Sequence, residues 1–193
     1  MSPVHRSDLI LGGVRSGKSR EALRLAAAMP RGARGAFLAT AQALDGDMEA
    51  RIARHRADRP KGWGTLEEPF DVVAACESLK DRVDVVVLDC LTLWVANLLL
   101  RGDEEKNILA AADGLANFLA ERRFSLVIVS NEVGAGVHPP TEVGLRFRDA
   151  LGGVNQRIAA AADRVSYMVA GLPMTIKDVP PPELSRERSP EAP

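Results

Sequence analysis

The sequence predicts an α/β fold in which a mostly parallel β-sheet is flanked by helices. Short segments rich in Val, Ile and Leu alternate along the chain with longer segments of helical periodicity. The Val-rich residues 83–88 are typical of a strand that is buried on both faces. Such alternation indicates parallel strands joined by right-handed helical crossovers.

The individual elements follow from local patterns. The apolar triplet at residues 9–11 and the run at residues 36–40 indicate the first two strands. Residues 47–58 are expected to be helical, because Met48, Ile52 and His55 recur at helical spacing. In chain order, we expect strands at residues 9–11, 36–40, 83–88, 124–129, 164–170 and 173–177. We expect helices at residues 19–29, 47–58, 70–79, 91–100, 104–122 and 142–162.

Composition places the chain among ordinary globular proteins. It has 193 residues, 46% hydrophobic and 26% charged, with a formal net charge of −1. Residues 1–177 are expected to form a single domain, whereas the Pro- and charge-rich residues 178–193 are expected to be a disordered tail. The near-neutral charge and 4% aromatic content argue against a nucleic-acid partner. No segment reaches membrane-spanning length, and two cysteines suit a reducing compartment, so we expect a cytoplasmic protein.

The most informative motif directly follows the first strand. Residues 12–19 read Gly12-Gly13-Val14-Arg15-Ser16-Gly17-Lys18-Ser19, which is the G-x-x-x-x-G-K-S pattern of a phosphate-binding loop (P-loop). Glycines allow the backbone N–H groups to converge on a phosphate, and the following helix N-terminus adds a positive dipole end. Lys18 would contact the β- and γ-phosphates of a nucleotide, and Ser19 would bind Mg²⁺.

Polar residues that follow the other strands are the next candidates, because ligands bind at the carboxyl ends of parallel strands. Asp89 follows the Val-rich strand and is the expected second Mg²⁺ ligand; alternatively, it caps the next helix. Thr40 ends the second strand. Residues 130–132 (Ser-Asn-Glu) open a glycine-containing loop that either closes over a substrate or is a simple turn.

A second unusual segment surrounds His55. Four arginines lie within residues 51–59, and Pro60 ends the segment. Positive neighbours disfavour the imidazolium form, and a neutral imidazole is a nucleophile that can attack phosphorus. From composition alone, a solvated basic helix face with an incidental histidine is the favoured explanation of the segment. His5 and His138 are weaker candidates.

Several motifs together resemble the bifunctional adenosylcobinamide kinase/adenosylcobinamide-phosphate guanylyltransferase family of coenzyme B12 biosynthesis. The resemblance extends from residue 9 to residue 171 in the family's order. The matching segments are residues 12–20, 39–41, 51–60 with Trp63, 88–92, 130–134, 147–149 and 155–157. The P-loop alone is shared by many families, whereas its combination with His-Arg-x-x-Arg-Pro and Asn-Glu-Val-Gly is highly specific.

The resemblance implies two reactions and a RecA-like P-loop fold. The first reaction phosphorylates a hydroxyl of adenosylcobinamide with ATP or GTP. The second transfers GMP from GTP to that phosphate through a guanylylated histidine, which falls on His55. It also implies a homotrimer. The nucleotide contacts implied are Gly12, Gly13, Val14, Arg15, Ser16, Gly17, Lys18, Ser19, Ala39, Thr40, Ala41, Arg56, Ala57, Asp58, Arg59, Glu67 and Asp89.

Two other interpretations remain at this point. The chain could be a different small-molecule kinase whose arginine-rich segment acts as a phosphate lid. It could also be a nucleotide-dependent switch or ATPase whose output is a partner interaction. The sequence lacks the Asn/Thr-Lys-x-Asp motif that reads guanine, which argues against a GTPase switch.

Overall fold

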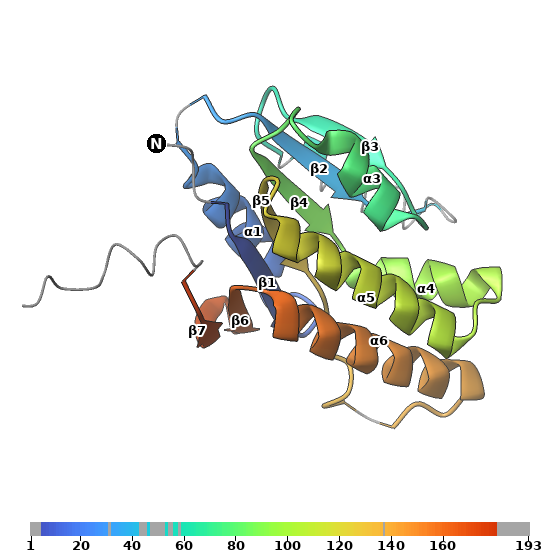
Figure 1. The fold of residues 1–193 in the computed structure, drawn as a ribbon. Helices are drawn as coiled ribbons and strands as arrows, with labels where there is room; N and C mark the ends of the chain where they lie inside the picture. The colour runs from blue at the N-terminus through green and yellow to red at the C-terminus, as the bar shows by residue number, and fades with distance from the viewer. Residues whose placement is uncertain are drawn as a thin grey trace, which may run out of the picture.

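The fold is an α/β arrangement of one seven-stranded sheet with helices on both faces (Figure 1). The computed structural model describes residues 5–30, 32–42, 46, 53, 56–57, 59–136 and 138–180. The strands are β1 (Ser7–Gly12), β2 (Gly35–Ala39), β3 (Gly64–Glu67), β4 (Val85–Asp89), β5 (Ser125–Val129), β6 (Arg164–Val169) and β7 (Leu172–Asp178). The helices are α1 (Lys18–Ala27), α3 (Val72–Leu79), α4 (Leu91–Arg101), α5 (Glu105–Glu121) and α6 (Glu142–Ala161).

Strand order determines which loops meet at the carboxyl edge of the sheet. The order is β3-β2-β4-β5-β1-β6-β7, and the first six strands are parallel. Strand β7 pairs antiparallel with β6 at the far edge. One strand, β5, therefore separates β1 from β4. The ends of these three strands carry the predicted P-loop, Asp89 and the segment 130–132.

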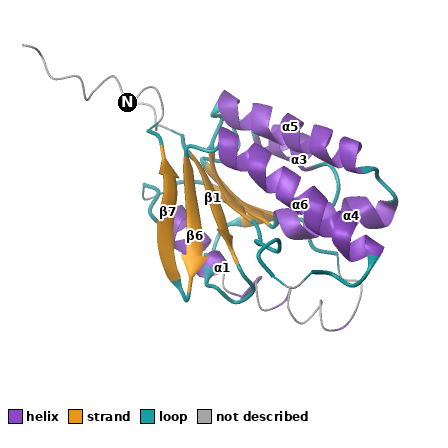
Figure 2. Ribbon diagram, turned by 90° about the horizontal axis from the view of Figure 1, so that it is seen from below, coloured by secondary structure: helices purple, strands orange, loops and turns teal. Residues whose placement is uncertain are grey.

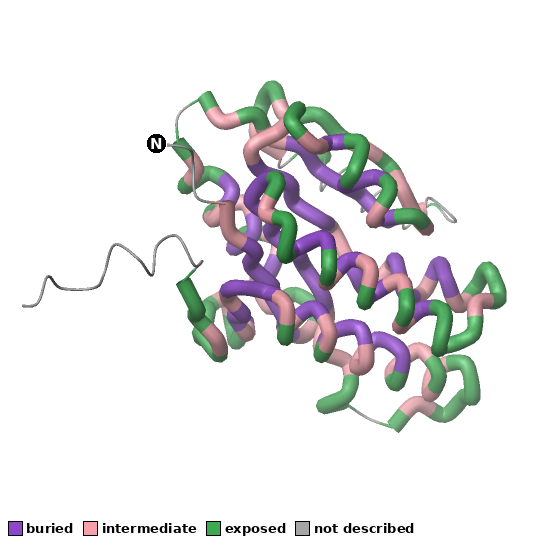
Figure 3. Tube along the Cα trace, in the orientation of Figure 1, coloured by how far each residue is buried: buried purple, intermediate pink, exposed green. Residues whose placement is uncertain are grey.

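Side-chain alternation along the central strands builds two cores. In β4, Val86 and Leu88 pack toward α3, α4, α5 and α6, whereas Val85 and Val87 pack toward α1. Figure 2 shows the four helices together on one side of the sheet. Buried residues follow the strands and the inner faces of the helices (Figure 3). This two-sided burial explains why the strands read as continuous apolar segments.

Most of the expected elements are present, with small differences at their ends. The strand expected at 9–11 extends over residues 7–12, and the one expected at 173–177 is β7. Helix α3 begins at Val72 because the side chain of Asp71 accepts a hydrogen bond from the Ala74 N–H, at 3.0 Å. Most of the helix expected at residues 47–58, and residues 181–193 of the expected tail, lie outside the described residues.

Strand β3 is the element that the sequence did not predict. Its four residues pair in parallel with β2, and three of them are exposed. Sequence patterns identify strands through buried or alternating apolar residues, and this edge strand has only one, Leu66. As shown below, β3 nevertheless carries partners of two predicted site residues.

Candidate active site

The loop between β1 and α1 has the backbone geometry that its glycines permit. Gly12 and Gly17 have φ angles of +147° and +99°, and Arg15 also has a positive φ. A Cβ atom at Gly12 would lie 2.8 Å from the carbonyl oxygen of Met168, so only glycine fits there. Gly17 is the N-cap of α1, which begins at Lys18. The residues predicted to cradle phosphate therefore form a turn that ends at a helix N-terminus.

Lys18 lies against the loop whose phosphate it is expected to contact. Its ammonium group donates hydrogen bonds to the carbonyl oxygens of Gly12 (2.9 Å) and Gly13 (2.6 Å). Lys18 is buried, whereas Val14 and Arg15 at the tip of the loop are exposed. The charge is thus already held beside the loop.

The turn between β6 and β7 supports the P-loop from the side. The N–H of Gly171 donates to the carbonyl oxygen of Ser16 at 3.0 Å. Arg20 also donates to the carbonyl oxygen of Gly171, at 3.4 Å. Gly171 also packs closely against Gly17. A Cβ atom added to Gly17 would lie 3.3 Å from the Cα atom of Gly171. The loop conformation is therefore a tertiary as well as a local property.

A cavity of about 400 Å³ brings three predicted site residues together beside α1. Ser19 from α1, Asp89 from the end of β4 and Arg59 from the segment before β3 all line it. Its other lining residues are Arg20, Ala22, Leu23, Phe37, Val87 and Val129. The residues Ser19, Asp89 and Arg59 thus bring a hydroxyl, a carboxylate and a guanidinium to one cavity, whose other lining residues are mostly apolar.

The helix-cap alternative would make Asp89 the N-cap of α4. The N-cap residue of α4 is instead the next residue, Cys90. Asp89 is instead the last residue of β4 and lines the cavity. The metal-ligand hypothesis therefore remains as the functional interpretation of this carboxylate.

Arg59 is held in position by residues of two strands. Its guanidinium carbon lies 4.7 Å from the centroid of the Phe37 ring, and its Nη1 donates to Thr65 Oγ1 at 2.7 Å. Burial lowers the pKa of Arg59, and Arg56 lowers it further, whereas Asp89 acts in the opposite direction. The side chain keeps its charge at neutral pH, since arginine titrates far above this range.

Arg56 and Glu67, both implied nucleotide contacts, form an ion pair with each other across an exposed surface. Thr65 and Glu67 are two residues apart on β3 and therefore lie on the same face of that strand. Two residues of the edge strand β3 thus contact two arginines, Arg56 and Arg59, that follow His55 in the sequence. Ala57 is exposed, whereas His55 and Asp58 lie outside the described residues.

The segment Ala39-Thr40-Ala41 begins at the last residue of β2, at the carboxyl edge of the sheet. The Thr40 side chain is fully buried. Its Oγ1 donates to the Cys90 carbonyl at 2.8 Å and accepts from the Cys90 N–H at 3.0 Å. Asn97 of α4 donates to the Thr40 carbonyl at 2.7 Å. The Thr40 hydroxyl therefore connects the ends of β2 and β4 in this structure, next to Asp89.

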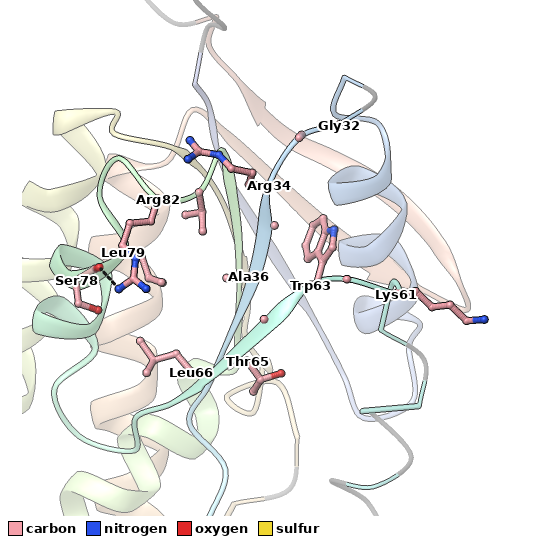
Figure 4. Close-up of a pocket in the computed structure, with 15 residues that line it drawn as sticks. Gly32, Arg34, Ala36, Lys61, Trp63, Thr65, Leu66, Ser78, Leu79 and Arg82 are labelled. Carbon is pink, nitrogen blue, oxygen red and sulfur yellow. Dashed lines mark hydrogen bonds between the residues drawn. The ribbon is translucent and has the colours of Figure 1, made fainter.

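A larger hollow of about 590 Å³ lies at the opposite ends of β2 and β3 (Figure 4). Arg34 lines it but is already bonded to Asp84 through its backbone N–H and its guanidinium. Lys61 points away from the other lining side chains in Figure 4. None of the predicted site residues lines this hollow, whereas three of them line the cavity at the carboxyl edge.

Sequence reasoning missed the residues that hold the site residues in place. Phe37 and Thr65 contact Arg59, and Asn155 bonds the segment after β5. Phe37 has the pattern of an ordinary buried strand residue, so nothing in the sequence marks it as part of a site. Thr65 lies in β3, the strand that was not predicted. Only Asn155 had a signal, since it belongs to one of the matching motifs. In the described part of the chain, no three His, Cys, Asp or Glu side chains cluster to hold a metal, and no helix is long and apolar enough to cross a membrane.

The P-loop follows β1 and Asp89 ends β4, and one strand, β5, lies between them. This arrangement defines a P-loop nucleotide-binding protein with a RecA-like fold. Comparison of structures agrees on the fold. A KaiC-like protein of Pyrococcus horikoshii OT3 matches with a TM-score of 0.51 and 15% identity, covering 86% of this chain and 71% of its own.

Sequence comparison then identifies the family. Residues 8–176 match the model of the cobinamide kinase/cobinamide phosphate guanyltransferase family, and the chain belongs to this family. It is 47% identical to the bifunctional adenosylcobalamin biosynthesis protein CobP of Pseudomonas aeruginosa, over 90% of this chain and 98% of the relative. It is 38% identical to CobU of Salmonella typhimurium, over 88% of this chain and 98% of the relative.

Proposed function

We propose that this chain catalyses both reactions of its family, as a kinase and guanylyltransferase of adenosylcobalamin biosynthesis. In the first, a hydroxyl of adenosylcobinamide attacks the γ-phosphorus of ATP or GTP, and a nucleoside diphosphate leaves. In the second, GMP passes from GTP to the new phosphate, giving adenosylcobinamide-GDP and pyrophosphate. The observation that carries this proposal is the cavity that joins Ser19, Asp89 and Arg59 beside the P-loop.

The kinase step needs positive charge around the transferring phosphate. Lys18 is held at the P-loop by the carbonyls of Gly12 and Gly13, from which it can reach a bound triphosphate. Arg59 and Arg20 add charge along the cavity wall. Fixed charges of this kind stabilise a phosphoryl transition state by several kcal/mol, roughly, without reorganisation.

The residues present fit a Mg²⁺ ion as well. Ser19 and Asp89 line the same cavity and supply a hydroxyl and a carboxylate, the hard oxygen donors that Mg²⁺ prefers. These two side chains would hold the ion together with nucleotide phosphates. When bound, it would neutralise charge on the β- and γ-phosphates.

The guanylyl transfer would use His55 as nucleophile. An imidazole nitrogen forms a bond to the α-phosphorus while the bond to the bridging oxygen breaks, and pyrophosphate leaves with that electron pair. A phosphate oxygen of the second substrate then attacks the same phosphorus and releases the imidazole. Support comes from Arg56, next to His55 in sequence, and Arg59, because both are anchored on β3 beside the cavity.

The remaining features of the proposal rest on the family resemblance. We propose a cytoplasmic homotrimer whose residues 1–177 act as one catalytic domain. The nucleotide contacts would be those of the P-loop, residues 39–41 and 56–59, Glu67 and Asp89. The substrates would be adenosylcobinamide and its phosphate.

The intermediate offers a direct test. Purified protein is incubated with GTP and Mg²⁺, and its intact mass is measured. We expect one GMP per chain, labile to acid and stable to alkali as a phosphoramidate, and mapping to His55. The H55A variant should lose the adduct and guanylyl transfer while keeping phosphorylation of adenosylcobinamide. H138A is the matched control and should keep the adduct; an adduct that persists in H55A would refute the assignment.

A further inference from the structure

The loop after β5 brings the backbone of one acidic residue, Glu132, against the P-loop. Strand β5 lies between β1 and β4, so its carboxyl end lies between the P-loop and Asp89. The N–H of Glu132 donates to the carbonyl oxygen of Gly12, the first P-loop glycine, at 3.2 Å. Glu132 is therefore anchored by its backbone to the loop that is expected to bind the transferring phosphate.

Two helices hold the backbone that precedes Glu132. Asn155 of α6 is buried; its Oδ1 accepts from Ser130 Oγ at 2.7 Å and its Nδ2 donates to the Asn131 carbonyl at 3.0 Å. The Asn131 N–H donates to Thr92 Oγ1 of α4 at 2.9 Å. The backbone before Glu132 is thus held by hydrogen bonds that involve three buried or half-buried side chains.

The Glu132 carboxylate is oriented by its own loop. Its Oε1 accepts a hydrogen bond from the Gly134 N–H at 2.6 Å. A Cβ at Gly134 would lie 2.9 Å from that oxygen, so glycine permits the close approach. One carboxylate oxygen is thus engaged, and the carboxylate retains further acceptor positions.

The other carboxylates at this edge are already committed. Glu67 pairs with Arg56, and Glu68 accepts from the N–H groups of Phe70 and Asp71. Asp71 caps α3, and Asp89, the proposed metal ligand, lines the cavity with Ser19. Glu132 forms no ion pair with any residue that the structure describes.

We propose that Glu132 is the general base of the kinase step, an assignment that rests on the proposed function. Its carboxylate accepts the proton of the substrate hydroxyl while that oxygen bonds to the γ-phosphorus. The bond from the γ-phosphorus to the bridging oxygen breaks, and the nucleoside diphosphate leaves with the electron pair. Guanylyl transfer needs no such base, because an unprotonated imidazole nitrogen and a phosphate oxygen attack without losing a proton.

The test separates the two reactions in the full-length protein. E132Q keeps the oxygen that accepts from Gly134 but cannot take up the proton. We expect its kcat for phosphorylation of adenosylcobinamide to fall on the order of 100-fold or more. Formation of the GMP adduct, and GMP transfer to supplied adenosylcobinamide phosphate, should stay within about twofold of the parent. E142Q, at the exposed start of α6, is the matched control and should keep all three rates.

The outcomes are distinguishable. E132D keeps a carboxylate and should therefore have a higher kinase rate than E132Q. If both variants fold normally, a purely structural role for the side chain would not predict this difference. An E132Q protein with the parent kinase rate overturns the role of Glu132 alone. Equal losses in all three measurements also overturn it, because they indicate a structural defect. A parent protein that forms the adduct without phosphorylating adenosylcobinamide refutes the kinase half of the proposed function itself.

Discussion

The two ends of the sheet use charged residues in opposite ways. At the amino ends of the strands, Asp163 accepts two hydrogen bonds from Arg122 and two from Ser7, and Asp8 pairs with Arg164. At the carboxyl ends, Asp89 and Arg59 line a cavity of about 400 Å³. Buried charge alone therefore does not mark a site. What distinguishes the carboxyl edge is open volume among charges that several separate segments contribute.

Substitution of Lys18, at the carboxyl end of the sheet, should have the largest effect on activity and little effect on stability. K18A should lower kcat for phosphorylation on the order of 1,000-fold, because a charge at the transferring phosphates is lost. Its thermal unfolding should change little, because Lys18 belongs to the phosphate-binding loop and not to either hydrophobic core. Steady-state kinetics and melting curves measure both effects, with the exposed K106A as control. A K18A protein with parent activity would show that the P-loop assignment is wrong.

Arg122 tests the amino end in the reverse sense. R122A leaves the buried Asp163 carboxylate without its cation, which should lower the free energy of unfolding by about 3 kcal/mol. Urea unfolding measures the change, and the kcat of the folded protein should be unaffected. R34A removes the more exposed pair with Asp84 at the same edge and should lower the free energy of unfolding much less. Similar losses in both variants would contradict the difference in burial.

Asp89 should matter for turnover more than for binding. D89N removes a carboxylate that lines the cavity opposite Arg59, so kcat should fall on the order of 100-fold at saturating Mg²⁺. Nucleotide affinity, measured by calorimetry, should change by less than the rate. Equal losses in affinity and rate, or no loss at all, would remove Asp89 from the metal site.

Two buried aspartates at the amino end should respond oppositely to acid. Burial alone would raise the pKa of Asp163, but hydrogen bonds from Arg122 and Ser7 hold it below its usual range. Its stabilisation is therefore present above about pH 4 and is lost as pH falls through the folded-state pKa. Burial raises the pKa of Asp8 despite Arg164 and Arg6, so acidification relieves a cost of folding there.

The corresponding variants separate these contributions. Between about pH 6 and about pH 3, D163N should lose less unfolding free energy than the parent, and D8N should lose more. Urea unfolding at a series of pH values measures both slopes. Parallel slopes for the two variants would show that the Arg122 contacts do not stabilise the ionised Asp163.

The P-loop and the fold class could be predicted because their signals are local. Gly12, Gly17 and Lys18 are fixed relative to one another by chain spacing, and buried parallel strands read as apolar runs. Strand β3 could not be predicted in this way, because an exposed edge strand needs no apolar pattern. The contacts that β3 makes with Arg56 and Arg59, on the C-terminal side of His55, could therefore not be predicted either.

Among the described residues, the sequence by itself determined the order of the helices and of every strand except β3, the phosphate-binding loop and the position of Asp89 at the end of a strand. Its combined motifs also indicated the family, which the comparisons confirm. Only the tertiary structure decided that Ser19, Asp89 and Arg59 share one cavity, and that Glu132 lies beside Gly12. The reason is physical: local patterns record which face a residue buries, whereas the strand order of the sheet determines which distant residues meet.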